Sequence, residues 1–174
     1  MPSIAQLLNF GDKRTTGKVD QVVELIKGSP QKFPHVFEAM KSPNPAVRMR
    51  AADAVVKLST DNPKLLEPYK DVLLNKISKV EQPEVRWHLA EMLTLVDLNP
   101  AEQAKAIKIM LHNLKTTQSR IVMAFSLQAI ADIALKNPVY TPILKQELKT
   151  AVKSDVFALA SRARILIKKH KLEI

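Results

Sequence analysis

Three side chains near the middle of the chain have the types and the spacing of a metal site. Glu84, His88 and Glu91 lie at positions i, i+4 and i+7, so a helix would place them on one face. Two carboxylates and an imidazole on one face can offer three ligands to a divalent cation. The same spacing is also typical of the solvated polar face of an amphipathic helix, and this is the interpretation we favour. We therefore expect no metal and no cofactor.

The only tryptophan of the chain, Trp87, lies inside the same segment, QPEVRWHLAEML. A large side chain at this place can pack between neighbouring helices with its N–H hydrogen-bonded. It can also face a groove and anchor a partner, because tryptophan, tyrosine and arginine are enriched among the residues that dominate binding energy. The sequence leaves both interpretations open.

A nucleotide site of the Walker type is not expected. The segment GDKRTTGKV resembles one, but five residues separate Gly11 from Gly17, one more than the motif has. Val19 stands where a serine or threonine would coordinate magnesium, and no strand precedes the segment. We interpret it as a polar loop between two helices. No glycine follows Gly28, so glycine-rich phosphate loops are not expected in the rest of the chain.

Composition limits the class of protein. The chain has 174 residues, of which 46% are hydrophobic, enough for a substantial core. It has no cysteine, so disulfides and thiolate metal sites are excluded. Its start lacks a basic-then-apolar leader, and no apolar run approaches the ~18 residues of a membrane helix. We expect a soluble cytoplasmic protein with no membrane contact.

The net charge of +10 is concentrated toward the C-terminus. Residues 1–102 hold 14 Lys or Arg against 13 Asp or Glu, whereas residues 103–174 hold 13 against 4. A basic face of this kind is either solvated or in contact with nucleic acid or another polyanion. If it binds a polyanion, the candidate residues lie on the outer and terminal helices: Lys105, Lys108, Lys115, Lys145, Lys149, Lys153, Arg162, Arg164, Lys168 and Lys169.

Two features recur with a period of 37 or 38 residues. They are the Asn-Pro dipeptide and a valine that opens a helical segment: Asn62-Pro63, Asn99-Pro100 and Asn137-Pro138, and Val47, Val85 and Val122. Each asparagine can cap a helix whose first position the proline takes, because that position needs no N–H donor. Two helices per period, repeated along the chain, predict an α-solenoid.

Each of these valines begins an apolar stripe at helical spacing, and no segment alternates like a strand. The predicted stripes are Val47, Ala51, Ala54, Val55 and Leu58; Val85, Leu89, Met92, Leu93 and Val96; and Val122, Ser126, Ala129, Ile130 and Ile133. We expect the other helices near 3–9, 18–27, 31–41, 63–80, 100–116, 138–153 and 155–171. Prolines inside two of them, Pro68 and Pro142, are expected to cause kinks.

The segments NPAVRMRAADAV and QPEVRWHLAEML, each preceded by a proline-containing helix, resemble the HEAT repeat of the armadillo-like α-solenoids. The Val-Arg pair that opens the second helix of such repeats is matched by Val47-Arg48 and Val85-Arg86. The resemblance covers roughly residues 30–170 and implies an all-α, right-handed superhelix of about four helix pairs. It implies a single domain over 1–174, with an atypical cap at 1–29 and repeats near 30–60, 62–98, 99–136 and 137–171.

In this family the second helices line a concave groove, and the residues just off the buried stripe face it. Stacked helices lie about 8–10 Å apart, so columns such as Arg50, His88 and Phe125 are expected to be lateral neighbours. On this interpretation Trp87→Ala or Arg50→Ala would lose about 2 kcal/mol of affinity while the fold survives. We expect the groove to bind another protein or a peptide through Met49, Arg50, Asp53, Lys57, Trp87, His88, Glu91, Phe125, Gln128 and Asp132.

Two enzyme classes built on similar repeats do not match the chain. Di-iron deoxyhypusine hydroxylases carry paired His-Glu dipeptides, and none of the four histidines here precedes a glutamate. HEAT-like alkylpurine DNA glycosylases carry a tryptophan with an aspartate one helical turn later, a spacing that Trp87 and Glu91 reproduce without the surrounding pattern. We therefore expect a non-catalytic scaffold. Polyanion binding is the alternative, and a glycosylase-like enzyme is a remote one.

Overall fold

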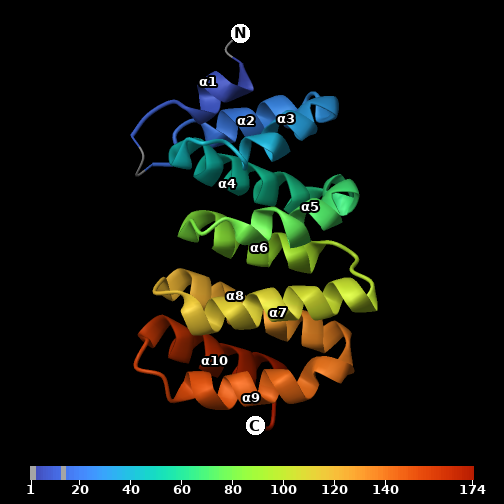
Figure 1. Cartoon of the computed structure of the whole chain (residues 1–174), viewed down its shortest axis with the longest axis vertical. Coiled ribbons are helices and arrows are strands. Elements are labelled where there is room, and N and C mark those ends of the chain that lie inside the picture. Colours follow the sequence, from blue (N-terminus) through green and yellow to red (C-terminus); the bar gives the residue numbers. More distant parts are fainter. Residues whose placement is uncertain (1–2, 13–14) are drawn as a thin grey trace. The chain divides into compact units, whose positions relative to one another are not determined.

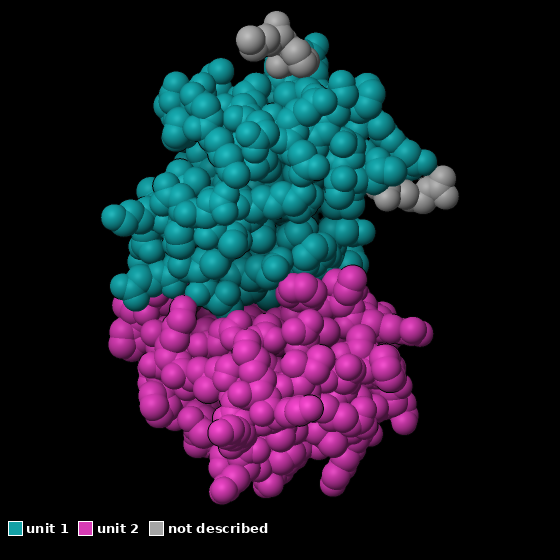
Figure 2. Space-filling model, turned by 180° about the vertical axis from the view of Figure 1, so that it is seen from behind, with its two compact units in different colours: residues 1–97 teal, residues 98–174 magenta. Residues whose placement is uncertain are grey.

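The computed structural model describes residues 3–12 and 15–174. Every regular element in these two ranges is a helix, which confirms the all-α fold. None of the described helices is long and apolar enough to cross a membrane. The chain divides into two compact units, Met1–Asp97 (unit 1) and Leu98–Ile174 (unit 2), which are coloured separately in Figure 2.

Unit 1 is built around one central helix, α4. This helix packs against α2, α3 and α6, and the short helix α1 packs against α2 and α4 (Figure 1). The described helices of unit 1, with 3₁₀ helices marked η, are α1 Ile4–Leu8, α2 Val19–Lys27, η1 Pro30–Lys32, α3 Phe33–Ala39, α4 Pro45–Asp61, η2 Pro63–Tyr69, α5 Lys70–Asn75, η3 Ile77–Lys79 and α6 Pro83–Leu95.

Unit 2 is organised in the same way around α8. This helix packs against α7, α9 and α10. The helices of unit 2 are α7 Pro100–Thr116, α8 Arg120–Lys136, η4 Pro138–Tyr140, α9 Thr141–Val152 and α10 Phe157–His170. The central helices of both units therefore begin with the segments that the period singles out.

The predicted apolar stripes form part of the core. Every residue of the three stripes is buried, including the hydroxyl-bearing Ser126 in α8. Residues such as Leu89 of α6 and Ile130 of α8 have at most 1% of their surface exposed. Burying a side chain of this size contributes about 1.5–3 kcal/mol, so each stripe supplies a large share of the stability of its helix pair.

Asn-Pro dipeptides start helices as predicted, but one of the asparagines makes no capping hydrogen bond. Asn99 forms a capping box with Glu102 at the start of α7, and the Asn137 side chain accepts a hydrogen bond from the Val139 N–H. Asn62 precedes η2 but makes no capping bond. A further dipeptide begins α4, where the Asn44 side chain accepts from the backbone N–H two residues later.

Two expectations about proline are wrong. The segment expected as one kinked helix at 63–80 is divided into η2, α5 and η3, with Pro68 inside the 3₁₀ helix η2. Because proline has no N–H to donate and crowds the preceding turn, a continuous α-helix does not form there. Pro142 causes no kink, since it occupies the first turn of α9, directly after η4. The backbone N–H groups of a first turn have no acceptor within the helix, so a proline at this place breaks no helical hydrogen bond.

Candidate partner-binding site

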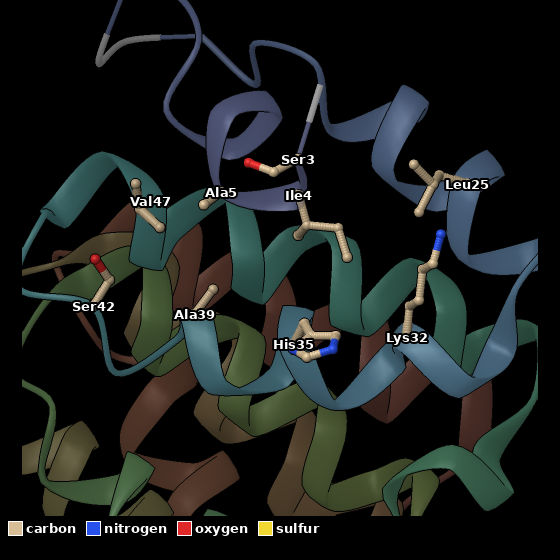
Figure 3. Close-up of a pocket in the computed structure, with 9 residues that line it drawn as sticks. All are labelled: Ser3, Ile4, Ala5, Leu25, Lys32, His35, Ala39, Ser42 and Val47. Atoms are coloured by element: carbon tan, nitrogen blue, oxygen red, sulfur yellow. The ribbon is translucent and has the colours of Figure 1, made fainter. Parts of the chain in front are cut away.

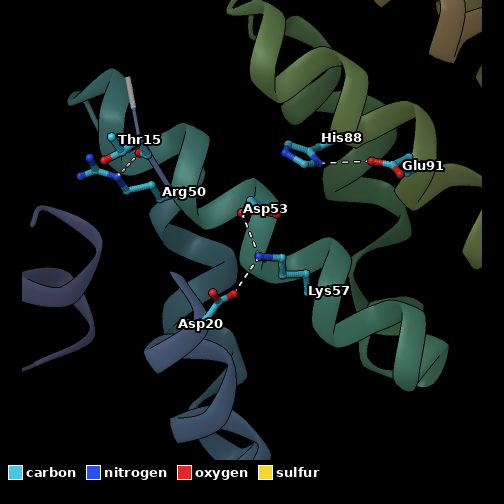
Figure 4. A network of polar contacts seen from close by, with 7 residues as sticks. All are labelled: Thr15, Asp20, Arg50, Asp53, Lys57, His88 and Glu91. Carbon is cyan, nitrogen blue, oxygen red and sulfur yellow. Dashed lines mark hydrogen bonds and ion pairs between the residues drawn. The ribbon is translucent and has the colours of Figure 1, made fainter. Parts of the chain in front are cut away.

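Arg50, which the sequence predicts to face a groove, has only 1% of its surface exposed. Its guanidinium donates to three backbone carbonyls: from Nε to Thr15 at 3.1 Å, from Nη1 to Leu8 at 2.9 Å and from Nη2 to Asp12. These carbonyls belong to the end of α1 and to the loop before α2, part of which is drawn in Figure 4. The prediction for Arg50 is therefore wrong. The side chain holds this loop against α4.

The same contacts distinguish the GDKRTTGKV segment from a phosphate loop. A phosphate loop turns its backbone N–H groups inward, whereas here carbonyl oxygens converge on a cation. Gly17 takes φ +57°, and a Cβ there would lie 2.4 Å from the Phe10 carbonyl oxygen and 3.0 Å from Arg50 Nε. Glycine is thus required where the loop passes over Arg50. Lys13 and Arg14 of this segment lie outside the described residues.

His88 is the second predicted groove residue that is buried, with 3% of its surface exposed. Its ring packs against the Trp87 ring, with centroids 3.5 Å apart, and its Nδ1 lies 3.2 Å from Glu91 Oε2. The imidazole is therefore buried, which corrects the expected solvated face at this position, whereas Glu84 and Glu91 are half-buried. In the described part of the chain, no group of three or more acidic, cysteine or histidine side chains is placed to hold a metal.

Trp87 itself is half-buried and forms one wall of a small cavity on unit 1. The cavity measures about 160 Å³, and its walls are mainly apolar. The residues around it come from α4, α6 and the loop before α2: Thr16, Met49, Arg50, Asp53, Glu84, Trp87 and His88. Trp87 therefore packs on the neighbouring histidine and also lines a cavity.

One charged residue of α4, Lys57, ties this surface to α2. Lys57 Nζ lies 2.9 Å from Asp20 Oδ1 and 3.4 Å from Asp53 Oδ2 (Figure 4). Burial, the largest single effect, lowers the pKa of Lys57, but the hydrogen bonds and charges of the two aspartates outweigh it and raise that pKa above its ordinary value. Lys57 is therefore charged and already paired within unit 1.

The predicted groove residues of α8 are half-buried and linked to α10 in unit 2. Arg162 of α10 donates from Nη1 to Gln128 Oε1 at 3.1 Å, and Gln128 donates from Nε2 to Asp132 Oδ1 at 2.8 Å. The Arg162 guanidinium also lies 5.9 Å from the centre of the Phe125 ring, within cation–π range. The sequence groups Arg162 with the basic C-terminal residues, but its side chain belongs to the surface around Gln128.

The other basic candidates of unit 2 are exposed, except that Lys145 is half-buried. Arg164 donates to the Val152 carbonyl at 3.4 Å. Lys145 and Lys149 of α9 and Lys153, the residue that caps its C-terminal end, repeat at every fourth position and form no ion pair with a described residue. The last two of them also line a hollow of about 710 Å³ near the end of α9. None of these three lysines is therefore paired with a carboxylate of the described chain.

Sequence reasoning missed the residues that reach α4 from outside the second helices. Thr15 contacts Arg50, and Asp20 contacts Lys57, at separations of 35 and 37 positions. Spacing within one helix does not indicate such contacts. The separations are close to one repeat, however, and that is the signal that could have found them. The expected columns of lateral neighbours, such as Arg50, His88 and Phe125, would join residues of unit 1 with residues of unit 2, and they stay a prediction.

Comparison with known proteins gives a match to one family. A family model described as a HEAT repeat domain matches residues 9–166. The match includes most of the segment interpreted above as an atypical cap. No curated protein and no solved structure matches the chain.

Proposed function

Because the chain belongs to the HEAT-repeat family, we propose that it is a non-catalytic scaffold that binds another protein or a peptide. The binding surface is the part of α4 and α6 around Trp87, and its anchor point is the cavity beside the tryptophan. The observation that carries the proposal is the position of Trp87, half-buried on the wall of that cavity. Burial of the remaining tryptophan surface by a partner would supply binding energy.

The size of the cavity supports a protein ligand rather than a small molecule. Sites for small organic molecules usually measure about 300–1,000 Å³, and this cavity measures about 160 Å³. A space of this size accommodates a single side chain. Tryptophan is also among the residue types most enriched where interfaces concentrate their binding energy.

The chemistry of the cavity favours a lysine or arginine side chain of the partner. Met49 and Trp87 offer apolar surface to the stem of such a side chain. Glu84 offers a carboxylate to its charged end and forms no ion pair with a described residue, whereas Asp53 is already paired with Lys57. The face of the tryptophan ring also attracts a cation.

Affinity capture with wild type and Trp87→Ala, followed by titration of the captured partner, tests the proposal. Trp87→Ala is expected to weaken binding by roughly 30-fold, the equivalent of about 2 kcal/mol. Phe157→Ala is the control, because Phe157 is 78% exposed but lies in unit 2. Since the chain has one tryptophan, its fluorescence must also change when the partner binds. Equal recovery of partners by wild type and Trp87→Ala would overturn the assignment.

A second function, polyanion binding, is supported by the unpaired lysines of α9. Charge reversal at Lys145, Lys149 and Lys153 is expected to weaken binding of nucleic acid and to reduce its salt dependence. Trp87→Ala should leave this binding unchanged, whereas it should weaken partner binding at the cavity by roughly 30-fold. Absence of any mobility shift with DNA or RNA at about 50 mM salt would rule out this function.

A further inference from the structure

A larger cavity lies at the N-terminal end of unit 1 and shares no lining residue with the cavity beside Trp87. It measures about 680 Å³. Figure 3 shows Ile4 of α1 and Leu25 of α2 pointing into the space, with His35 of α3 and Lys32 of η1 across from them. The complete lining is Ser3, Ile4, Ala5, Leu25, Lys32, His35, Ala39, Ser42 and Val47.

The lining divides into an apolar part and a basic part. Its surface is mainly apolar, and Ile4, Leu25 and Val47 contribute the largest aliphatic side chains. Lys32 and His35 are the only lining residues with a basic side chain, and no acidic residue lines the cavity. Both are exposed and form no ion pair with a described residue. A ligand that matches this surface has an apolar body and an anionic group.

We propose that this cavity binds a small amphiphile with one anionic head group, such as a medium-chain carboxylate or an alkyl phosphate. The alkyl chain lies against Ile4, Leu25 and Ala39, and the head group contacts Lys32 and His35. The volume falls within the range of about 300–1,000 Å³ that is typical of small-molecule sites. This site is independent of partner binding at Trp87.

One larger occupant, a second copy of the chain, fits the cavity less well. A second copy of the chain would need an exposed apolar group to insert. The most exposed large apolar side chain among the described residues, Phe157, lies on α10 together with Arg164 and Lys168. These cations would be brought near Lys32 and His35.

The proposal is tested by titrating the whole chain, followed by amide NMR, with octanoate, decanoate, decyl phosphate and decan-1-ol below their micellar concentrations. Decanoate should shift the amides around Ile4, Leu25 and Ala39 and should saturate. Each added methylene is expected to tighten binding up to about fourfold. The neutral alcohol should bind about threefold to tenfold more weakly than the anions. The ratio between decanoate and decyl phosphate identifies which head group the site prefers.

Variants separate a specific site from adsorption to apolar surface. Replacement of both Lys32 and His35 by glutamine should weaken decanoate binding by about threefold to tenfold and leave decan-1-ol unchanged. Both side chains are exposed, so the fold should be retained. Lys64→Gln is the matched control, since this exposed lysine does not line the cavity. Ala39→Leu should fill the space and weaken all ligands.

Three results would overturn the proposal. They are non-saturable shifts, shifts centred away from the residues that line the cavity, and equal decanoate affinity of the double glutamine variant and wild type. The double glutamine variant replaces only exposed side chains, so it decides between these results even if the Ala39→Leu variant fails to fold. Loss of partner capture by Trp87→Ala has no bearing on it, since the two sites share no residue.

Discussion

Replacement of Arg50 by methionine tests whether its guanidinium holds the N-terminal loop against α4. Methionine retains much of the length and apolar character of the stem but cannot donate to the carbonyls of Leu8, Asp12 and Thr15. We expect the loop to detach and the free energy of unfolding of unit 1 to fall. This outcome differs from the sequence-based prediction for Arg50, which was a loss of affinity with the fold intact.

The expected magnitude follows from the three hydrogen bonds. Bonds from a charged donor contribute about 1.5–3 kcal/mol each, so three of them set an upper range of about 4.5–9 kcal/mol. Asp12 and Thr15 lie in an exposed loop, and their carbonyls regain water once the loop moves, whereas the Leu8 bond is buried. The arginine also loses its hydration on folding, which methionine avoids. We therefore expect a loss of about 3 kcal/mol.

Urea denaturation monitored by the fluorescence of Trp87 measures this loss, because the only tryptophan lies in unit 1. Arg86→Met is the matched control. Arg86 is half-buried, and its Nε donates to the Val80 carbonyl at 3.3 Å, so its replacement should cost less than about 1 kcal/mol. Arg50→Lys should recover less than half of the loss, since an ammonium does not reproduce the geometry of three guanidinium bonds. Equal losses for Arg50→Met and Arg86→Met would refute the reasoning.

Three further predictions concern local features. Gly17→Ala should destabilise unit 1 by about 1–3 kcal/mol in the same denaturation assay, because the added Cβ would lie 2.4 Å from a carbonyl oxygen. Gly28→Ala is the control: its Cβ would have no contact under 3.7 Å, so this change should be neutral or stabilising. Asn99→Ala should cost about 1 kcal/mol by calorimetry through loss of the capping box, and the same change at the asparagine before η2, which makes no cap, should cost less. Two hydrogen bonds hold the pKa of Glu67 below its ordinary value of 4.5. The bond from Lys70 has the larger effect, and the bond from the backbone N–H of Asp97 has the smaller one. The ionised Glu67 carboxylate therefore stabilises the fold above pH 4.5, and this contribution is lost as the pH falls through the lowered pKa. A carboxyl NMR titration of Glu67 with a midpoint at or above 4.5 would contradict this prediction.

The helices and the core could be predicted because their signals are local. The stripe that begins at Val85 depends only on spacing within one helix, and all of its members are buried. Arg50 and His88 have spacing appropriate to a groove, but both are covered by groups that spacing does not reveal. The end of α1 and the loop before α2 cover Arg50 from 35 to 42 positions earlier, and the adjacent Trp87 ring lies tilted against the His88 ring. Polar residues beside a stripe are exposed only if nothing else covers them.

The covering contacts nevertheless follow the repeat. Hydrogen bonds join residues 34–37 positions apart in both units: Asn9 with Asn44, Asp20 with Lys57, Arg48 with Gln82, Gln103 with Asn137, and Gln128 with Arg162. These separations approximate one period, and the first two extend the series into the segment before residue 30. Several residues predicted to face a groove are therefore engaged in contacts between successive helices of their own unit. Side chains outside this series, such as Met49, Glu84 and Trp87, retain surface for a partner, which is why the proposed binding site centres on the cavity that they line.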